Sequence, residues 1–204
     1  MVKRNKCFFC IVFILLALLF TENPSVWSAN VTTLGIPMKS EPGSNTAIPV
    51  IELPMPQSER EKGYLGLSGT GNFTIGQIKA QVLIIEVYSF YCPHCQRSAS
   101  QVNELYQMIQ ERTDIRDKIK MIGIAVSNSP YEVESYRDRY NVLFPLISDA
   151  STDISQKLGV KGTPTFIGYK VDGKGFQERF YFQEGGFDDA QQLLAKIIKL
   201  SGLE

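Results

Sequence analysis

The sequence predicts an α/β protein in which a central mixed β-sheet carries helices on both faces. Three features predict it: two apolar runs suited to fully buried strands, a helix-like segment after each run, and a hairpin followed by a last amphipathic helix. The chain has 204 residues, of which 44% are hydrophobic. Such a chain can bury a sizeable core in one or at most two domains, so wholesale disorder is excluded.

The strands of this sheet follow from continuous apolar sequence. Residues 82–91 (VLIIEVYSFY) and 121–126 (MIGIAV) are apolar, β-branched or aromatic almost throughout, which is typical of strands covered on both faces. The predicted elements, in order, are a strand at 82–91, a helix from Pro93 to Arg112, a strand at 121–126, a helix from Pro130 to Tyr140, a strand at 144–148, a helix at 153–159, strands at 165–171 and 176–183, and a final helix.

Capping and turn residues set the limits of the helices and the hairpin. Residues 127–129 (Ser-Asn-Ser) can cap a helix that has Pro130 in its first turn. Residues 172–175 (Asp-Gly-Lys-Gly) form the hairpin turn. Asp188 is the predicted cap of the last helix, whose apolar residues recur at helical spacing.

Residues 1–28 are predicted to be an export signal. Three basic residues within residues 3–6 precede a 14-residue apolar run, residues 7–20, and a polar stretch follows. Cleavage is expected after Ser28, which would leave the mature chain in the periplasm or another extracytoplasmic space. The alternative is an uncleaved anchor that tethers the chain to the inner membrane through residues 7–20. Fourteen residues at about 1.5 Å each reach only ~21 Å, short of the ~30 Å hydrocarbon core.

Residues 29–60 are predicted to be a proline-rich linker or extended arm, and residues 61–204 the folded domain. Five of the ten prolines lie in this arm, among glycine, serine and asparagine. A short strand at 48–53 that joins an edge of the sheet is also expected.

The charge balance excludes some partners. The chain has 21 basic and 21 acidic residues, without the basic excess of a nucleic-acid-binding protein, so no nucleic-acid partner is expected. Three of the basic residues and one of the acidic residues lie in residues 1–28. The remainder therefore has 18 basic and 20 acidic residues, a net charge of −2.

Counting cysteines indicates redox chemistry. Two of the four cysteines lie inside the predicted signal, so the mature chain keeps only Cys92 and Cys95. A disulfide between residues so close together closes a very small loop and adds little of the loop-closure stabilisation of a structural disulfide. In an oxidising compartment, this pair is better suited to disulfide chemistry.

The sequence Tyr91-Cys92-Pro93-His94-Cys95 places this pair where the first buried strand ends and a helix begins. The unpaired N–H groups and the dipole at a helix N-terminus favour an anion, which lowers the pKa of the Cys92 thiol and makes it the nucleophile. Pro93 fits the first turn, and His94 can add a donor or a positive charge beside the sulfur, the alternative being a solvent-facing helix residue with no effect on the sulfur. Cys95, about one turn along, is expected to lie deeper and to resolve the mixed disulfide.

The motif has other uses in proteins, and its neighbouring residues bear on each of them. A structural zinc site needs four nitrogen or sulfur ligands, and the mature chain offers two cysteines and one histidine, so no metal or other cofactor is expected. Covalent haem attachment needs histidine directly after the second cysteine, where Gln96 stands. A non-catalytic binding module with a structural Cys92–Cys95 disulfide remains the alternative function.

Together with a second motif, the cysteine pair resembles the thioredoxin superfamily. Residues 162–166 (Gly-Thr-Pro-Thr-Phe) are similar to the cis-proline loop of that family, which packs against the two sulfurs. The resemblance implies a thioredoxin-like fold, a cis Pro164, and a Thr163 backbone that pairs with the client. Tyr91, in place of the usual tryptophan, and Pro93 complete the implied substrate-binding residues.

Glu86 is a carboxylate inside the first apolar run, six residues before Cys92. Burying the ionised carboxylate without a partner would cost on the order of several kcal/mol. The group should therefore be protonated, linked to water or paired with a charge. Thioredoxins have an acid at this spacing, which implies that Glu86 moves protons to and from the resolving thiol. A glutamate that reaches solvent at the strand edge is the alternative.

The branch of the superfamily is indicated by several segments. SFYCPHCQ, FPLISD and GVKGTPTF resemble exported TlpA/ResA-type proteins over roughly residues 61–204, whereas Cys-Pro-His-Cys is the dipeptide motif of the oxidant DsbA. The expected function is thiol–disulfide exchange with protein clients, with the direction left open. A membrane electron-transfer protein is the expected redox partner, and a monomer the expected state. A peroxidase is disfavoured, because the Pro/Thr-flanked cysteine of peroxiredoxin-type sites is not matched around Cys92.

Overall fold

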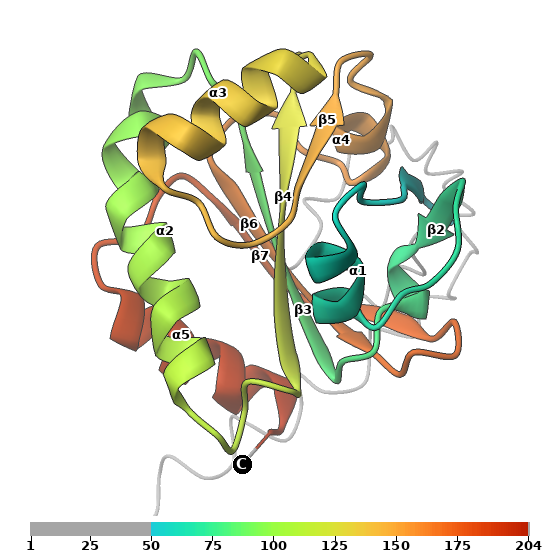
Figure 1. Ribbon diagram of the computed structural model, residues 1–204. Coiled ribbons are helices and arrows are strands. Elements are labelled where there is room, and N and C mark those ends of the chain that lie inside the picture. Colours follow the sequence, from blue (N-terminus) through green and yellow to red (C-terminus); the bar gives the residue numbers. More distant parts are fainter. Residues whose placement is uncertain (1–49, 204) are drawn as a thin grey trace, which may run out of the picture. The chain divides into compact units, whose positions relative to one another are not determined.

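The computed structural model describes residues 50–203, and they contain one five-stranded sheet and one two-stranded sheet (Figure 1). The larger sheet has the strand order β5-β4-β3-β6-β7. The predicted signal or anchor, residues 1–28, lies outside the described residues, as does most of the predicted arm. The elements in chain order are β1 (Glu52–Pro54), α1 (Glu59–Leu65), β2 (Asn72–Thr74), η1 (Ile75–Gln77), β3 (Val82–Tyr88), α2 (Pro93–Glu111), β4 (Ile119–Val126), α3 (Pro130–Tyr140), β5 (Leu146–Asp149), α4 (Asp153–Lys157), β6 (Thr165–Val171), β7 (Gln177–Glu184) and α5 (Ala190–Ser201).

The central strand is β3, and all seven of its residues are buried. It runs parallel to β4 and antiparallel to β6, while β6 and β7 form the predicted hairpin, so the sheet is mixed as expected. The strand is three residues shorter than predicted. The chain turns after Tyr88, where the backbone N–H of Cys92 donates to the carbonyl oxygen of Ser89 at 3.0 Å. This turn brings Cys92 to the start of α2.

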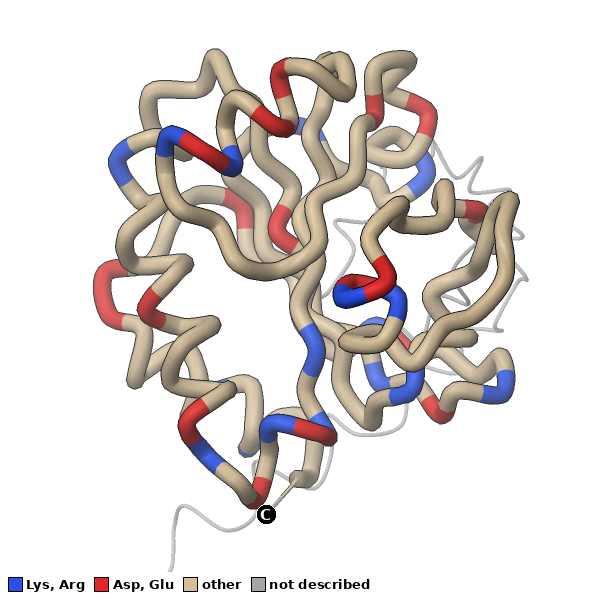
Figure 2. The backbone as a smooth tube through the Cα atoms, in the orientation of Figure 1, with Lys and Arg blue, Asp and Glu red and all other residues tan. Residues whose placement is uncertain are grey.

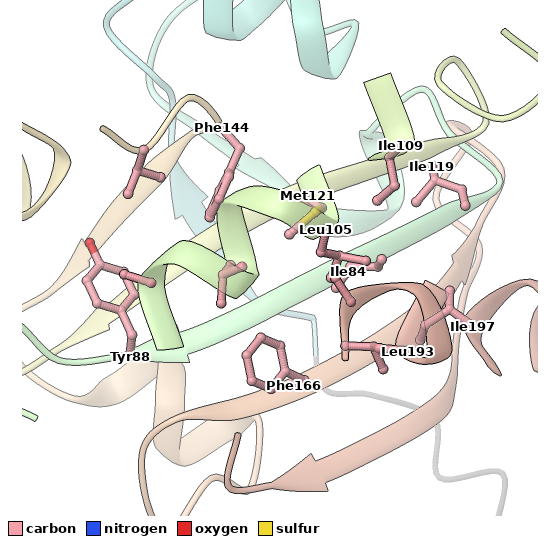
Figure 3. Close-up of a cluster of buried hydrophobic side chains, with 14 of the residues drawn as sticks. Ile84, Tyr88, Leu105, Ile109, Ile119, Met121, Phe144, Phe166, Leu193 and Ile197 are labelled. Atoms are coloured by element: carbon pink, nitrogen blue, oxygen red, sulfur yellow. The ribbon is translucent and has the colours of Figure 1, made fainter. Parts of the chain in front are cut away.

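Helices cover both faces of the sheet, which confirms the predicted fold class. On one face, α2, α3 and α5 pack on β3 and β4 through the apolar cluster in Figure 3, which includes Leu105 of α2 and Leu193 of α5. On the other face, a second cluster joins Leu83 and Ile85 of β3 to α1 and η1. Alternation along β3 directs successive side chains to the two faces.

The folded part extends further toward the N-terminus than predicted. Ile51 and Leu53 are 1% and 0% exposed and belong to the second cluster, so the domain boundary at residue 61 was placed too late. The expected strand at 48–53 is β1, which pairs antiparallel with β2 and not with an edge of the large sheet. The structure therefore places Ile51, Leu53 and Met55 of the predicted arm in the core, while residues 57–60 are exposed.

Helix α1 lies beside β4 where β5 does not pair with it. The pairing of β4 with β5 begins only at Gly123. The backbone N–H of Met121 donates instead to the hydroxyl of Tyr64 in α1, at 2.8 Å. One residue of the same helix, Glu61, forms an ion pair with Arg137 of α3 at 3.0 Å. Side chains of α1 thus fill the edge that the short strand β5 leaves open.

The helix caps agree with the sequence at α3 and differ at α5. Ser129 caps α3 in a capping box with Glu132, and Pro130 is in the first turn, as predicted. The cap of α5 is Asp189, which accepts from the backbone N–H of Gln192 at 2.9 Å, and the predicted cap Asp188 is one residue too early. Both residues are Asp, so the local sequence could not distinguish them.

Charged residues of both signs are interspersed along the described chain (Figure 2). Helix α3, for example, carries both Glu134 and Arg137, which form an ion pair at 3.1 Å. No helix within residues 50–203 is long and apolar enough to cross a membrane.

Candidate active site

Cys92 is the N-cap residue of α2. Its backbone is extended, and its sulfur accepts a hydrogen bond from the backbone N–H of Cys95 at 3.3 Å. Pro93 occupies the first helical turn, where its missing N–H leaves no intrahelical bond unmade. Cys92 is partly exposed, whereas Cys95 is 0% exposed, which is the predicted difference in depth.

The two thiols have opposite pKa shifts. Partial burial acts to raise the pKa of the Cys92 thiol, but hydrogen bonds from the Cys95 and Thr163 side chains and from the backbone of Cys95 and His94 outweigh it, so the pKa is lowered. Burial, and then the hydrogen bond with Cys92, raise the pKa of Cys95 to about 12. Cys92 therefore supplies the thiolate, while Cys95 keeps its proton at neutral pH.

The loop before β6 meets the cysteine pair. The Thr163–Pro164 peptide bond is cis. The Cys92 thiol lies 3.3 Å from the carbonyl oxygen of Thr163, to which it donates while protonated, although the two residues are 71 apart in sequence. The carbonyl of the buried Pro164 accepts from the backbone N–H of Gly185 at 2.8 Å, which fixes the loop against the segment after β7.

Glu86 lies on β3, on the face that packs against α2. Its side chain is 1% exposed, so it is buried and does not reach solvent at a strand edge. Burial, followed by the charge of Cys92, raises its pKa to about 8. Within residues 50–203, its Oε1 atom has no hydrogen-bond partner. A protonated carboxyl group whose pKa responds to the charge of Cys92 can therefore act as an acid, and its ionised form as a base.

The His94 imidazole contacts Arg97 and not the Cys92 sulfur, where the sequence suggested that it would act. Its Nδ1 lies 2.9 Å from Nη2 of Arg97, one turn along α2. A guanidinium has only donors, so Nδ1 accepts this hydrogen bond. The described contacts of the Cys92 sulfur include the backbone of His94 but not its ring. The residue thus acts on the thiolate through its amide.

Tyr91 lies at the rim of the site and is 64% exposed. Its hydroxyl donates to the carboxylate of Glu132, the residue that completes the capping box of α3. This contact ties the segment before Cys92 to the start of α3, while most of the Tyr91 side chain stays exposed.

Three residues that support the site were missed by the sequence analysis. Tyr136 of α3 donates its hydroxyl to the carbonyl oxygen of Cys95 at 3.2 Å. Asn128 is completely buried, and its Oδ1 accepts from the backbone N–H of Phe90 at 2.8 Å, while Gln96 donates to the carbonyl of Phe90 at 2.7 Å. A polar residue two positions after an apolar strand was the only available signal for Asn128.

Two surface hollows flank the nucleophile. One, of about 250 Å³, is bordered by Ser89, Ser127, Lys161 and Thr163, among others. The second, of about 280 Å³, is bordered by His94, Arg97 and the segment 186–188. Among the described residues, no group of three His, Cys, Asp or Glu side chains is arranged to hold a metal ion.

The fold and the cysteine pair define the class: a thioredoxin-like α/β protein with a Cys-x-x-Cys site at a helix N-terminus, facing a cis-proline loop. A family model described as the AhpC/TSA family matches residues 46–182. The chain belongs to the AhpC/TSA family.

Several named proteins and solved structures are similar to this chain. The thiol-disulfide oxidoreductase ResA of Halalkalibacterium halodurans is 22% identical over 91 residues, which are 45% of this chain and 49% of ResA. The chain spans about half the length of the curated relatives it matches. A putative thiol:disulfide interchange protein DsbE from Chlorobium tepidum is 15% identical, with a TM-score of 0.57 over 79% of this chain and 100% of that chain. A thiol:disulfide interchange protein of the thioredoxin family from Chlorobium tepidum is 14% identical, with a TM-score of 0.54 over 78% of this chain and 99% of that chain.

Proposed function

We propose that the chain is a thiol–disulfide oxidoreductase that exchanges disulfides with protein clients through Cys92 and Cys95. One observation carries the proposal: an accessible thiol with a lowered pKa lies one helical turn from a buried thiol with a raised pKa. A disulfide kept only for stability has no need of this difference. The ResA relatives are named for the same activity.

The exchange proceeds in two steps. The Cys92 thiolate attacks one sulfur of a client disulfide, forms a mixed disulfide and releases the other client sulfur as a thiolate. Cys95 then loses its proton and attacks the Cys92 sulfur, which forms the Cys92–Cys95 disulfide and releases the second client thiolate. The client gains two electrons and the enzyme loses two. The same steps in reverse oxidise a client dithiol.

Glu86 is the proposed proton carrier for Cys95. In the step that releases Cys95 as a thiolate, the protonated carboxyl group gives it a proton, and in the reverse step the carboxylate takes the proton. Glu86→Gln should slow the step that activates Cys95 and leave the attack by Cys92 intact. Equal rates for the variant and the wild type from about pH 6 to pH 9, a range that brackets the usual window of acid–base catalysis, would rule out this role.

The client is proposed to bind along the cis-proline loop. The Thr163 backbone would pair with an extended client segment as an added strand, next to Pro164. Tyr91 and Pro93 are both exposed beside Cys92 and offer apolar contact to the residues that flank the client cysteine.

His94 is proposed to tune the redox couple through its backbone amide, which hydrogen-bonds the Cys92 sulfur. The test is His94→Pro. A reduction potential within about 10 mV of the wild type, well under the ~30 mV that corresponds to a tenfold change in equilibrium constant, would show that this histidine does not tune the couple.

The cellular setting is also a proposal. An export signal in residues 1–28, cleaved or retained as an anchor, would place the domain outside the cytoplasm, where a membrane electron-transfer protein resets its redox state. A proline-rich arm up to about residue 50 would separate the two parts. The domain is proposed to act as a monomer, since the arm is too short and irregular to supply a dimerisation domain.

Two measurements test the function and its direction. Brief alkylation at neutral pH should modify Cys92 quickly and Cys95 hardly at all, whereas an unreactive pair would favour a non-catalytic binding module. Equilibration in a glutathione series, read by alkylation and mass, gives the reduction potential. A value near −120 mV, about that of DsbA, indicates an oxidant, and a value near −270 mV, about that of thioredoxin, indicates a reductant.

A further inference from the structure

Two buried polar groups on β3 have no hydrogen-bond partner in the described part of the chain. They are the Oε1 atom of Glu86 and the hydroxyl of Tyr88. The residues are two apart on one strand, so their side chains point to the same face, and they are 1% and 0% exposed. An unsatisfied buried polar atom costs about 1–3 kcal/mol, so two of them together require an explanation.

The Tyr88 ring extends from β3 across the neighbouring strand. Gly123 of β4 is the register partner of Glu86. A Cβ atom at Gly123 would lie 3.1 Å from the Tyr88 ring and 2.5 Å from the side chain of Leu146. The Tyr88 ring therefore lies over β4 at Gly123, the residue that pairs with Glu86 in the sheet. Its hydroxyl lies at the end of the core cluster opposite Ile197 (Figure 3).

Helix α3 completes the surroundings of Tyr88. The ring centroids of Tyr88 and Tyr136 are 4.4 Å apart, and Tyr136 donates to the carbonyl oxygen of Cys95. The charges of Arg137 and Glu134, paired at 3.1 Å, both act on the Tyr88 hydroxyl. The Glu134 side chain of this pair is 62% exposed. Tyr88 thus shares its strand face with a buried carboxyl group, and its ring packs on the helix that carries a charged pair reaching solvent.

Glu86 needs an outlet for its proton. Because its pKa is raised to about 8, mainly by burial, the group holds a proton at neutral pH. It must give that proton to solvent before it can take the proton of Cys95, yet the side chain is almost completely buried. The proton therefore has to pass through another group.

We propose that the Tyr88 hydroxyl is the proton outlet of Glu86, and this inference rests on the proposed function. Because the hydroxyl has no direct hydrogen-bond partner among residues 50–203, bridging waters make the links: the hydroxyl takes the proton of Glu86 through one water and passes its own proton through another toward the Glu134–Arg137 pair, where solvent removes it. Tyr88 remains a neutral phenol after each passage, which agrees with the upward shift that burial imposes on its pKa. Tyr88 is a positioning residue, because it acts on the sulfurs only through Glu86.

Other titratable groups surround Glu86 and Tyr88. They are Cys92 and Cys95 at the start of α2, and Glu134, Tyr136 and Arg137 on α3. The register partners of Glu86 on the adjacent strands are Gly123 and Phe166, neither of which can titrate.

The test uses the reduced full chain and an aromatic disulfide, 5,5′-dithiobis(2-nitrobenzoate). The attack by Cys92 releases one coloured thiolate, and resolution by Cys95 releases the second, so the two steps appear as separate phases. In Tyr88→Phe the first phase should be unchanged, and the second should slow by at least about tenfold, a modest share of what a positioned proton-transfer group contributes. The second phase should also show a larger solvent deuterium isotope effect.

The reduction potential separates a relay from a packing effect. A relay changes the rate and leaves the two end states alone, so Tyr88→Phe should keep the wild-type potential. The matched control is Tyr169→Phe, which removes a hydroxyl from a buried tyrosine in the cluster on the opposite face of the sheet and should leave both phases unchanged.

Three results decide the matter. A second phase in Tyr88→Phe as fast as in Tyr169→Phe overturns the proposed outlet. A second phase and a potential that shift together overturn it in favour of a structural role. A wild-type chain without the fast first phase contradicts the proposed function itself, and the outlet with it.

Discussion

Replacing Glu86 with Gln should change how the free energy of unfolding depends on pH. The folded state raises the pKa of this carboxyl group from 4.5 to about 8, mainly because the group is buried. The folded chain then binds the proton more tightly than the unfolded chain. Its contribution to stability is complete below about pH 4.5 and is lost as the pH rises toward 8.

The size of the effect follows from this shift. Within the window the wild type loses about 1.4 kcal/mol of stability per pH unit relative to a variant that cannot ionise at this position. Between pH 5 and pH 7 the accumulated difference is about 2.5 kcal/mol. Glu86→Gln, which keeps the shape and stays neutral, should therefore be more stable than the wild type at pH 7 by more than it is at pH 5.

Urea unfolding of the reduced proteins at several pH values measures this difference. Subtracting the wild-type free energy from that of the variant removes the contribution of every other titrating group that the two share. Comparing proteins with and without Glu86→Gln in a Cys92→Ser background removes the Cys92 charge, which also raises the pKa of Glu86. A difference that does not vary with pH would show that Glu86 is ionised in the folded state and would refute the reasoning.

Three further predictions concern packing, capping and reactivity. Gly123→Ala should lower the free energy of unfolding by about 1–3 kcal/mol, because a methyl group there would lie 2.5 Å from a methyl carbon of Leu146; an unchanged urea midpoint would contradict this packing. Asp189→Ala should cost about 1 kcal/mol through the lost cap of α5, and an equal loss in Asp188→Ala would show that the cap is wrongly placed. The alkylation rate of Cys92 should rise with pH to a midpoint below the usual thiol pKa, as its lowered pKa requires, and a midpoint at or above the usual value would disprove that shift.

The sheet and its large helices were predictable because each is encoded locally. Strands β3 and β4 are continuous apolar runs, and the adjacent residues Ser129 and Pro130 indicate where α3 begins. The segment that holds Ile51 and Leu53 gave no such signal. Its strand has three residues, and it is ordered by contacts with distant elements. Proline-rich sequence of this kind is compatible with a linker as well as with a packed arm.

The site was predictable in its reacting groups and less so in their support. The positions of Cys92 and Cys95 follow from the strand–helix junction, and the resemblance brought Thr163 to them. The hydrogen bond from Tyr136 to Cys95 could not be foreseen, since it depends on how α3 crosses α2. The same holds for His94, whose ring is directed by Arg97, a neighbour one turn away with many possible conformations.

The bond between the Tyr64 hydroxyl and the Met121 amide has a practical consequence for where this chain can be shortened. A fragment that starts at residue 61 keeps the tyrosine but loses β1 and the first residues of α1, so β2 would lack its described partner and the helix its first turn. The open edge of β4 could then pair with an edge of another molecule, since unpaired backbone groups at a strand edge promote aggregation. A fragment that starts at residue 50 keeps this edge covered, so it is the truncated form suited to crystallisation.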